Sequence, residues 1–174
     1  MVEPNDDVGG VASAGGVGGV AGVSSADGVG RDGVAANQPW LYSDVVKTHF
    51  FNPRNLVRSR EEALELDKRA SGVGTAGSPA CGDLMKLWII VKAGRIVECK
   101  WQTFGCASAI ASTSVFSEML TEGNGMLVEG ALKVSPRDIV ARLGGLPAIK
   151  FHCSVLADRA FKAAVADWRG RGGA

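Results

Sequence analysis

The fold of this chain is decided by residues 77–104, which read GSPACGDLMKLWIIVKAGRIVECKWQTF. Large apolar or β-branched residues dominate 84–91, apolar and polar residues largely alternate over 95–104, and Ala93-Gly94 lies between the two segments. This pattern predicts an antiparallel hairpin with one buried face. Cys99 falls inside the second strand, and nothing in its spacing marks it as a ligand, so we expect a structural or incidental thiol.

The loop before the hairpin carries two groups that bind metals. Cys81 and Asp83 stand two residues apart, after a glycine-rich approach over 71–77. A thiolate is a soft ligand suited to iron–sulfur clusters, zinc or copper(I), whereas a carboxylate is hard and exchanges more readily. The glycines indicate backbone mobility, or a chain that passes close to a bound group. Together these residues predict a site that holds metal and also releases it.

Two further cysteines lie where helices are expected to begin. Cys106 follows the second strand at the first turn of a small-residue helix, and Cys153, with His152 beside it, begins the last helix. Free backbone N–H groups and the positive end of the helix dipole stabilise a thiolate at such positions. For Cys106 the alternative of a small buried cysteine that fills a strand-to-helix corner stays open.

Further helices are predicted from capping residues and apolar periodicity. They are a helix capped by Ser43 and ended by 52–55, a charged segment over 58–69, and a helix that begins at Ser135-Pro136 and ends at Gly144-Gly145. His49 falls on the first of these helices. We expect it to be a packed or capping histidine and not a ligand.

Length and composition indicate one domain with a tail. The chain has 174 residues, enough for one ordinary domain. Residues 1–37 form an imperfect Gly/Val pattern with no aromatic residue, which cannot offset the entropy lost on ordering so many glycines. We expect a disordered tail over 1–37, a domain over 38–169 and a frayed basic end over 170–174.

Charge and apolar runs exclude two classes of partner. The formal net charge is +1, which argues against a nucleic-acid binder that neutralises phosphates. No secretory signal is visible, and the longest apolar run, Leu87 to Val91, is too short to span a bilayer. We therefore expect no membrane partner and a cytoplasmic, reducing setting, where the four cysteines would be ligands or catalysts more often than cross-links.

The candidate ligands form one set drawn from three element boundaries. They are Cys81, Asp83, Cys106, His152 and Cys153. Three thiolates with one oxygen or nitrogen satisfy a tetrahedral zinc ion, and equally the cysteine-rich shell of a [2Fe–2S] cluster. The cysteine spacings of 25 and then 47 residues fit no CxxC-type zinc finger, and the signature of a zinc-dependent deaminase does not occur.

Several segments together resemble the U-type iron–sulfur scaffold family, which comprises IscU and the N-terminal domain of NifU. The segments follow the family's order at comparable spacing, within a match from about Leu41 to Trp168. They are residues 42–43, 52–55, 79–87, 103–112 and 151–157. The resemblance implies an α+β fold in which a small antiparallel three-stranded sheet packs against several helices, with the metal or cluster site at one end.

The resemblance also implies roles for single residues. Cys81, Cys106 and Cys153 match the three ligand cysteines, each a candidate persulfide acceptor, and Asp83 matches the family's aspartate. His152 matches the histidine that precedes the third cysteine. The remaining matches are Lys150, a lysine near the site, and Tyr42, an N-terminal tyrosine linked in the family to dimerisation.

The implied function is that of a scaffold, neither a turnover enzyme nor a redox carrier. In this family a cysteine desulfurase delivers sulfur as a persulfide, iron is bound, and a ferredoxin-type donor supplies electrons. The labile [2Fe–2S] cluster then moves to apo iron–sulfur proteins. The same ligands would also hold zinc in the isolated protein. Two alternatives stay open: a zinc-bound sulfur-acceptor partner of a desulfurase, and a binding module that zinc merely stabilises.

Two features refine this resemblance. The segment Leu146-Pro147-Ala148-Ile149-Lys150 resembles the family's Leu-Pro-Pro-Val-Lys chaperone-recognition motif, but Ala148 replaces its second proline, which weakens the inference of an Hsp70-type partner. The short interval between Cys106 and Cys153, together with His152, favours the IscU/NifU branch over the SufU branch.

Overall fold

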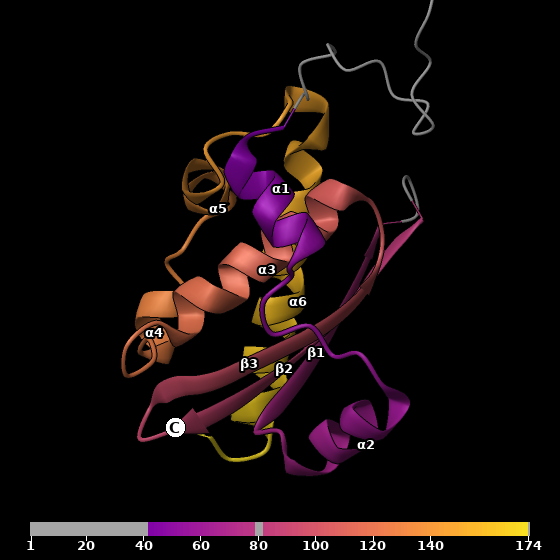
Figure 1. The fold of residues 1–174 in the computed structure, drawn as a ribbon. Coiled ribbons are helices and arrows are strands. Elements are labelled where there is room, and N and C mark those ends of the chain that lie inside the picture. Colours follow the sequence, from indigo (N-terminus) through magenta and orange to yellow (C-terminus); the bar gives the residue numbers. More distant parts are fainter. Residues whose placement is uncertain (1–41, 79–81, 174) are drawn as a thin grey trace, which may run out of the picture. The chain divides into compact units, whose positions relative to one another are not determined.

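The computed structural model describes residues 42–78 and 82–173. Its sheet has three antiparallel strands in the order β1-β2-β3. The strands are β1 (Gly72–Ser78), β2 (Asp83–Lys92) and β3 (Arg95–Phe104). Helices pack around this sheet (Figure 1), so the predicted α+β class with a three-stranded antiparallel sheet is confirmed.

Strands β2 and β3 form the predicted hairpin. Their register runs from Leu84 opposite Phe104 to Lys92 opposite Arg95, with an irregularity at Ile90/Val91. Ala93 and Gly94 turn the chain with φ values of 48° and 70°, the left-handed pair that suits a tight hairpin turn. As predicted, Cys99 is a structural thiol: it lies fully buried in the core, and burial strongly raises its pKa.

The glycine-rich approach over 71–77 is not a mobile loop, and that prediction is wrong. It forms β1, an edge strand paired antiparallel with β2. The glycines allow a helix to lie directly on the strand: a Cβ on Gly72 would stand 2.1 Å from the Ala164 carbonyl oxygen, and one on Gly74 would stand 2.0 Å from that of Ala160. The close approach anticipated for a bound group is therefore made to α6 (Phe151–Gly170).

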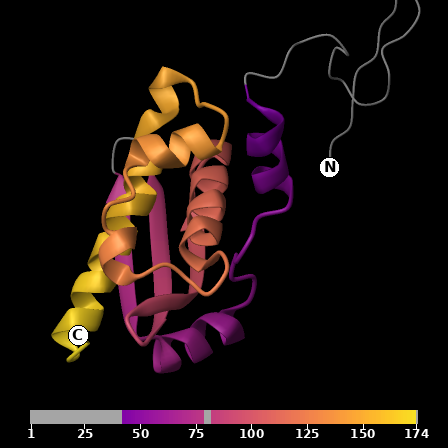
Figure 2. The same cartoon turned by 90° about the vertical axis from the view of Figure 1, so that its left-hand side faces the viewer.

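One face of the sheet carries the main core. Helices α3 (Ala107–Thr121) and α6 cross it side by side (Figures 1 and 2). The rings of Phe116 and Phe161 meet edge to face between them, with centroids 5.5 Å apart. The largest fully buried side chains of this core are Met85, Leu87, Ile89, Trp101, Phe116 and Phe161.

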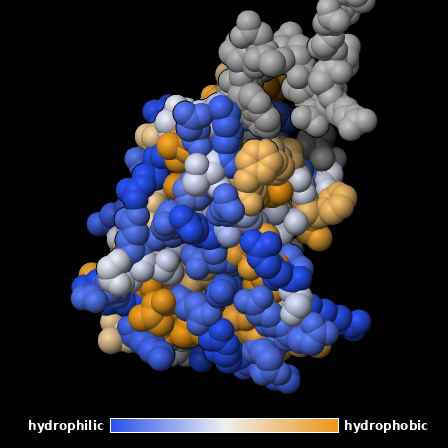
Figure 3. Space-filling view, viewed as in Figure 1, coloured by the Kyte–Doolittle hydropathy of each residue, from blue (hydrophilic) through white to orange (hydrophobic). Residues whose placement is uncertain are grey.

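The opposite face carries a smaller cluster beside α2 (Arg60–Arg69), the helix predicted from the charged segment. Because side chains alternate along a strand, Trp88 points away from Leu87 and Ile89. It packs against Leu66 of α2, and its indole N–H donates to Asp67 at 2.7 Å. The space-filling view in Figure 3 shows a mainly hydrophilic surface with isolated apolar patches.

Helix α1 (Asp44–Phe51) packs beside α3, with Val46 buried in the main core and polar residues hydrogen-bonded around it. Ser43 caps it, as predicted, and also donates to the Leu143 carbonyl. His49 is a packed histidine, with Nδ1 2.8 Å from the Ser114 hydroxyl. Burial lowers the pKa of His49, which favours the neutral imidazole.

The C-terminal half contains two short helical elements that the sequence did not predict, α4 (Val128–Ala131) and η1 (Ala148–Lys150). Helix α5 (Pro136–Arg142) begins with the expected capping box of Ser135 and Asp138, and the short 3₁₀ helix η1 leads into α6. Helix α4 has only four residues and no side-chain cap, so it lacks the signals used for prediction. Across the described part of the chain, no helix has the length and apolarity required to cross a membrane.

Candidate metal centre

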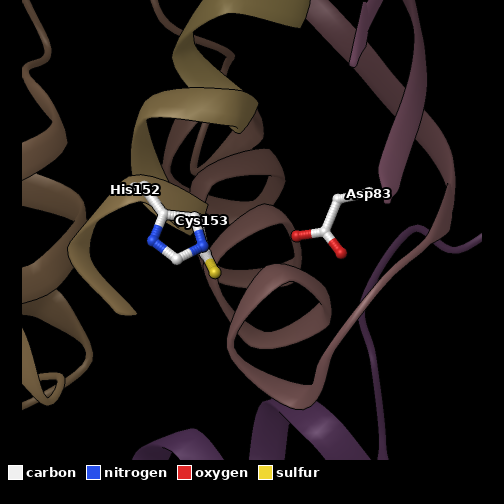
Figure 4. A group of neighbouring side chains, drawn as sticks. All are labelled: Asp83, His152 and Cys153. Atoms are coloured by element: carbon white, nitrogen blue, oxygen red, sulfur yellow. The ribbon is translucent and has the colours of Figure 1, made fainter. Parts of the chain in front are cut away.

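Three elements bring metal-binding groups together at one end of the sheet. Asp83 is the first residue of β2, and His152 and Cys153 lie in the first turn of α6. One ligand atom from each of these three residues lies within 4.8 Å of the other two. Figure 4 shows the carboxylate of Asp83 directed toward the thiol and the imidazole. Side chains from distant parts of the sequence therefore converge on one small volume.

Cys106 joins this group from the start of α3, where it is the N-cap residue. Its Sγ lies 3.5 Å from the Sγ of Cys153, and both cysteines are free. A disulfide would need about 2.05 Å between the sulfurs. Two thiolates on one tetrahedral zinc ion, with bonds of about 2.3 Å, lie about 3.8 Å apart. The observed separation is close to that of two sulfur ligands sharing a metal.

Asp83 occupies an unusual position for a carboxylate. The alternation along β2 sets it on the same face as Met85 and Leu87, and it is 6% exposed. Its Oδ2 is buried and has no hydrogen-bond partner among the described residues. A buried carboxylate oxygen without a partner is costly, and a bound cation would supply the missing compensation. The donor set therefore fits a bound metal.

The neighbouring ligands His152 and Cys153 differ in solvent exposure. Cys153 is fully buried whereas His152 is exposed, so the imidazole stands at the rim of the group. Burial raises the pKa of Cys153 to about 12, and the neighbouring thiol of Cys106 and the carboxylate of Asp83 add to the rise. This environment favours the neutral thiol of Cys153, contrary to the expectation that the start of α6 stabilises a thiolate there. A metal ion that binds Cys153 has to displace the proton.

Cys81, the first predicted ligand, lies outside the described residues, together with Pro79 and Ala80. The strand ends that flank them, Ser78 and Asp83, are opposite each other in the register of β1 and β2. Of the five predicted ligands, the structure thus brings together Asp83, Cys106, His152 and Cys153.

The accessory residues lie on or near the rim of the site. The hydroxyl of Tyr42 accepts a hydrogen bond from Ser108 at 3.1 Å, and Ser108 stands two residues after Cys106 in the first turn of α3. Sequence reasoning missed Ser108, whose only signal is that place in the helix. Lys150 is the half-buried N-cap of α6.

The chaperone-motif-like segment 146–150 is displayed on the surface. Ile149 is 78% exposed, an unusual fraction for an isoleucine, and Ala148 is also exposed. An exposed apolar side chain next to the site is available for contact with another protein. Its recognition by a chaperone stays a prediction.

Comparison with known proteins agrees with this geometry. Residues 41–174 match the family model of the NifU-like N terminal domain. The chain is 46% identical over 128 residues to iron-sulfur cluster assembly scaffold protein IscU 1 of Archaeoglobus fulgidus, covering 74% of this chain and 76% of the archaeal protein. It is also 46% identical over 132 residues to the iron-sulfur cluster assembly enzyme IscU of Drosophila melanogaster, covering 74% and 79%.

The fold has solved counterparts as well. The crystal structure of the N-terminal part of a nitrogen-fixing NifU-like protein from Brucella abortus superposes with a TM-score of 0.54 at 15% identity, covering 75% of this chain and 96% of that one. At this identity the likeness concerns the fold alone. The family model, by contrast, matches most of the chain, including every described residue of the metal centre. The chain therefore belongs to the family of NifU-like N-terminal domains, which includes the IscU proteins.

Proposed function

We propose that this protein is a scaffold on which an iron–sulfur cluster is assembled and from which the cluster passes to apo-proteins. The observation that carries the proposal is the unpaired, buried Oδ2 of Asp83 beside the paired thiols of Cys106 and Cys153. The names of the relatives from Archaeoglobus fulgidus and Drosophila melanogaster support it, since both refer to iron–sulfur cluster assembly. The cluster is the cargo of the protein and leaves it intact.

We assign the cluster ligands as Cys81, Cys106 and Cys153, with Asp83 or His152 in the fourth position. The chain itself supports the inclusion of Cys81, because two peptide links of about 3.8 Å each tether its Cα to that of Asp83. A shell of this composition suits a [2Fe–2S] cluster, and the same ligands would hold zinc in the isolated protein. One non-thiolate ligand leaves a weaker corner that an acceptor cysteine can attack.

Exposure suggests which cysteine receives sulfur first. A thiolate has to attack the outer sulfur of the desulfurase persulfide, so the acceptor needs access and a deprotonated sulfur. Cys153 is fully buried with a raised pKa, whereas Cys106 is half-buried. Of these two cysteines we infer that Cys106 accepts sulfur before Cys153 does, and Cys81 stays a further candidate. Each transferred sulfane sulfur takes two electrons to become sulfide, and a ferredoxin-type donor would supply them.

The remaining partners follow from the same role. They are a cysteine desulfurase, apo iron–sulfur acceptor proteins and, through the exposed segment around Ile149, an Hsp70-type chaperone, although Ala148 weakens that last assignment. Tyr42 at the rim of the site would take part in a homodimer. We place the protein in the cytoplasm and keep the expectation that it is not a turnover enzyme. The zinc-bound sulfur-acceptor alternative is not favoured, because the relatives are named for cluster assembly.

Anaerobic reconstitution tests the function. The protein is incubated with ferrous iron, cysteine, a desulfurase and a reductant, and a visible charge-transfer band is expected. After incubation with an apo-ferredoxin and separation of the two proteins, the band should have moved from the scaffold to the ferredoxin. Cys106→Ser and Cys153→Ser should abolish the band, whereas Cys99→Ala should keep it, because Cys99 lies in the core of β3 and outside the metal centre. Activation of the desulfurase without colour would instead indicate a sulfur acceptor. If neither colour nor activation is seen, the site would hold a zinc ion that only stabilises the fold.

A further inference from the structure

Gly105 connects β3 to α3 and lies directly against the carboxylate of Asp83. A Cβ at this position would stand 3.0 Å from Oδ1 and 3.1 Å from Cγ of Asp83. It would also stand 3.2 Å from the Cβ of Ala109. These distances are a few tenths of an ångström shorter than ordinary van der Waals contact. The absence of a side chain at Gly105 therefore leaves the room that the carboxylate occupies.

The backbone does not require glycine here. The described glycines with positive φ are Gly82, Gly94, Gly123, Gly125, Gly144, Gly145 and Gly172, and Gly105 is not among them. An alanine could adopt the local conformation without strain. The crowding also differs from that at Gly74, where a Cβ would meet backbone atoms of α6 that cannot move aside. At Gly105 the nearest atoms belong to a side chain that is able to shift.

The carboxylate cannot shift without changing its distance to the other ligands. Asp83 is buried on the inner face of β2, its carboxylate is close to Gly105, and one of its oxygens lies within 4.8 Å of ligand atoms of both His152 and Cys153. A methyl group at Gly105 would displace the carboxylate within this confined space. The consequence is a changed metal–oxygen contact with the rest of the fold in place.

We propose that Gly105 is a positioning residue. Because it has no side chain, it leaves room for the Asp83 carboxylate and so sets the position of this carboxylate and the strength with which it binds the metal as the fourth ligand. This inference rests on the proposed function insofar as Asp83 is a metal ligand. Gly105 itself contacts no metal. In the sequence Gly105 is only one residue of the family-like segment 103–112, and a single glycine before a cysteine has no signal that assigns it this role.

Cobalt(II) binding to the apo-protein tests the inference without any cluster. Thiolate charge-transfer bands report the cysteines, and the ligand-field bands report the fourth ligand. Gly105→Ala should keep the thiolate bands, shift the ligand-field bands and weaken cobalt affinity about tenfold, the lower range for changes next to a ligand. Gly130→Ala is the matched control, because a Cβ there finds no neighbour closer than 3.7 Å; it should bind cobalt as the wild type does.

A double-mutant cycle separates positioning from general damage. In an Asp83→Ala background the carboxylate is gone, so adding Gly105→Ala should change neither the spectrum nor the affinity further. An equal loss in both backgrounds overturns the proposal, and so does wild-type binding by Gly105→Ala. If Gly105→Ala unfolds, the double variant Gly105→Ala/Ala109→Gly removes the contact with Ala109 and keeps the contact with Asp83, and the same cycle is run on it.

The experiments distinguish failure of the Gly105 proposal from failure of the proposed scaffold function. A protein that binds cobalt through Asp83 but assembles no cluster would overturn the scaffold proposal and leave the role of Gly105 in place. If the wild type assembles clusters but Gly105→Ala has the cobalt spectrum of the wild type, the scaffold proposal stands and the role of Gly105 is overturned. If Asp83→Ala leaves the wild-type cobalt spectrum unchanged, Asp83 is no ligand and the role of Gly105 is overturned.

Discussion

Replacement of Asp83 by alanine should stabilise the metal-free protein, although most substitutions of buried residues do the opposite. The carboxylate is 6% exposed and its Oδ2 has no hydrogen-bond partner among the described residues. A buried polar group without a partner costs about 1–3 kcal/mol, and more when it is charged. The loss of a few side-chain atoms leaves only a small cavity, so the net gain in unfolding free energy should be about 1–2 kcal/mol.

The assay is urea unfolding of the metal-free protein, with a chelator present. A gain of this size should raise the unfolding midpoint without changing the slope. Asp158→Ala is the matched control, because Asp158 is also 6% exposed but its carboxylate is paired with the ammonium of Lys162 at 2.9 Å. Removal of this paired group should destabilise the fold or leave it unchanged.

Bound metal should reverse the order of stability of the wild type and Asp83→Ala. Zinc binds only the folded state, so it should stabilise the wild type more than Asp83→Ala, because the wild type offers one more ligand. A metal-free Asp83→Ala protein that is less stable than the wild type would refute the reasoning, since the carboxylate would then have partners that compensate its burial.

Four further outcomes are expected. A cluster assembled on Asp83→Ala should move to an acceptor about tenfold more slowly than from the wild type, a barrier change of about 1.4 kcal/mol. The rate is measured as the gain of cluster by the separated acceptor, and an equal rate would exclude Asp83 as the point of release. The folded-state pKa of His49 lies below its unfolded value of 6.5, so the unfolded chain takes up the proton first. Stability should therefore fall as pH drops from about 7.5 to about 5.5, and His49→Gln should flatten this slope in urea melts. Gly74→Ala should lower the unfolding free energy by about 3 kcal/mol or more through collision with α6, whereas Gly77→Ala, whose Cβ would find no atom nearer than 3.7 Å, should not. Deletion of residues 1–37 should leave cluster assembly intact, and abolished assembly would show that the tail has a role.

Local sequence signals predicted the elements whose stability is decided locally. Alternation over 95–104 and the turn at Ala93-Gly94 predicted the hairpin. Ser43 and Ser135 predicted two helix starts, since each side chain caps a backbone N–H three residues later. These signals involve only a few neighbouring residues, so they can be recognised without knowledge of the tertiary structure.

Strand β1 could not be predicted in the same way. Its glycines are typical of a loop, and the reason for them lies in α6, some ninety residues further along the chain. Only the packed structure supplies that reason. Asp83 is an intermediate case: the alternation that buries Met85 and Leu87 also predicts an inward carboxylate, but the sequence analysis treated Asp83 as part of a loop.

The sequence predicted which residues belong to the metal centre, but it did not predict the distances between them. The motifs identified the donor residues, and the structure brings Asp83, Cys106, His152 and Cys153 together. The separation of the two sulfurs depends on how α3 and α6 pack, which no local signal contains. The roles of these residues, and that of Cys81, stay predictions for the experiments above.

The hydrogen bonds around α1 have a consequence for how the domain opens. The face of α3 beneath α1 carries fully buried hydroxyl groups, among them Ser108, Ser114 and Ser117, which bond to Tyr42, His49 and Asn55. Water can replace such bonds when the helices separate, whereas it cannot replace the apolar packing of α6 on the sheet. Residues 42–55 should therefore exchange their amide hydrogens before the sheet does. Because Tyr42 moves with them, this segment could uncover the start of α3 while the ligands on α6 and β2 stay in place.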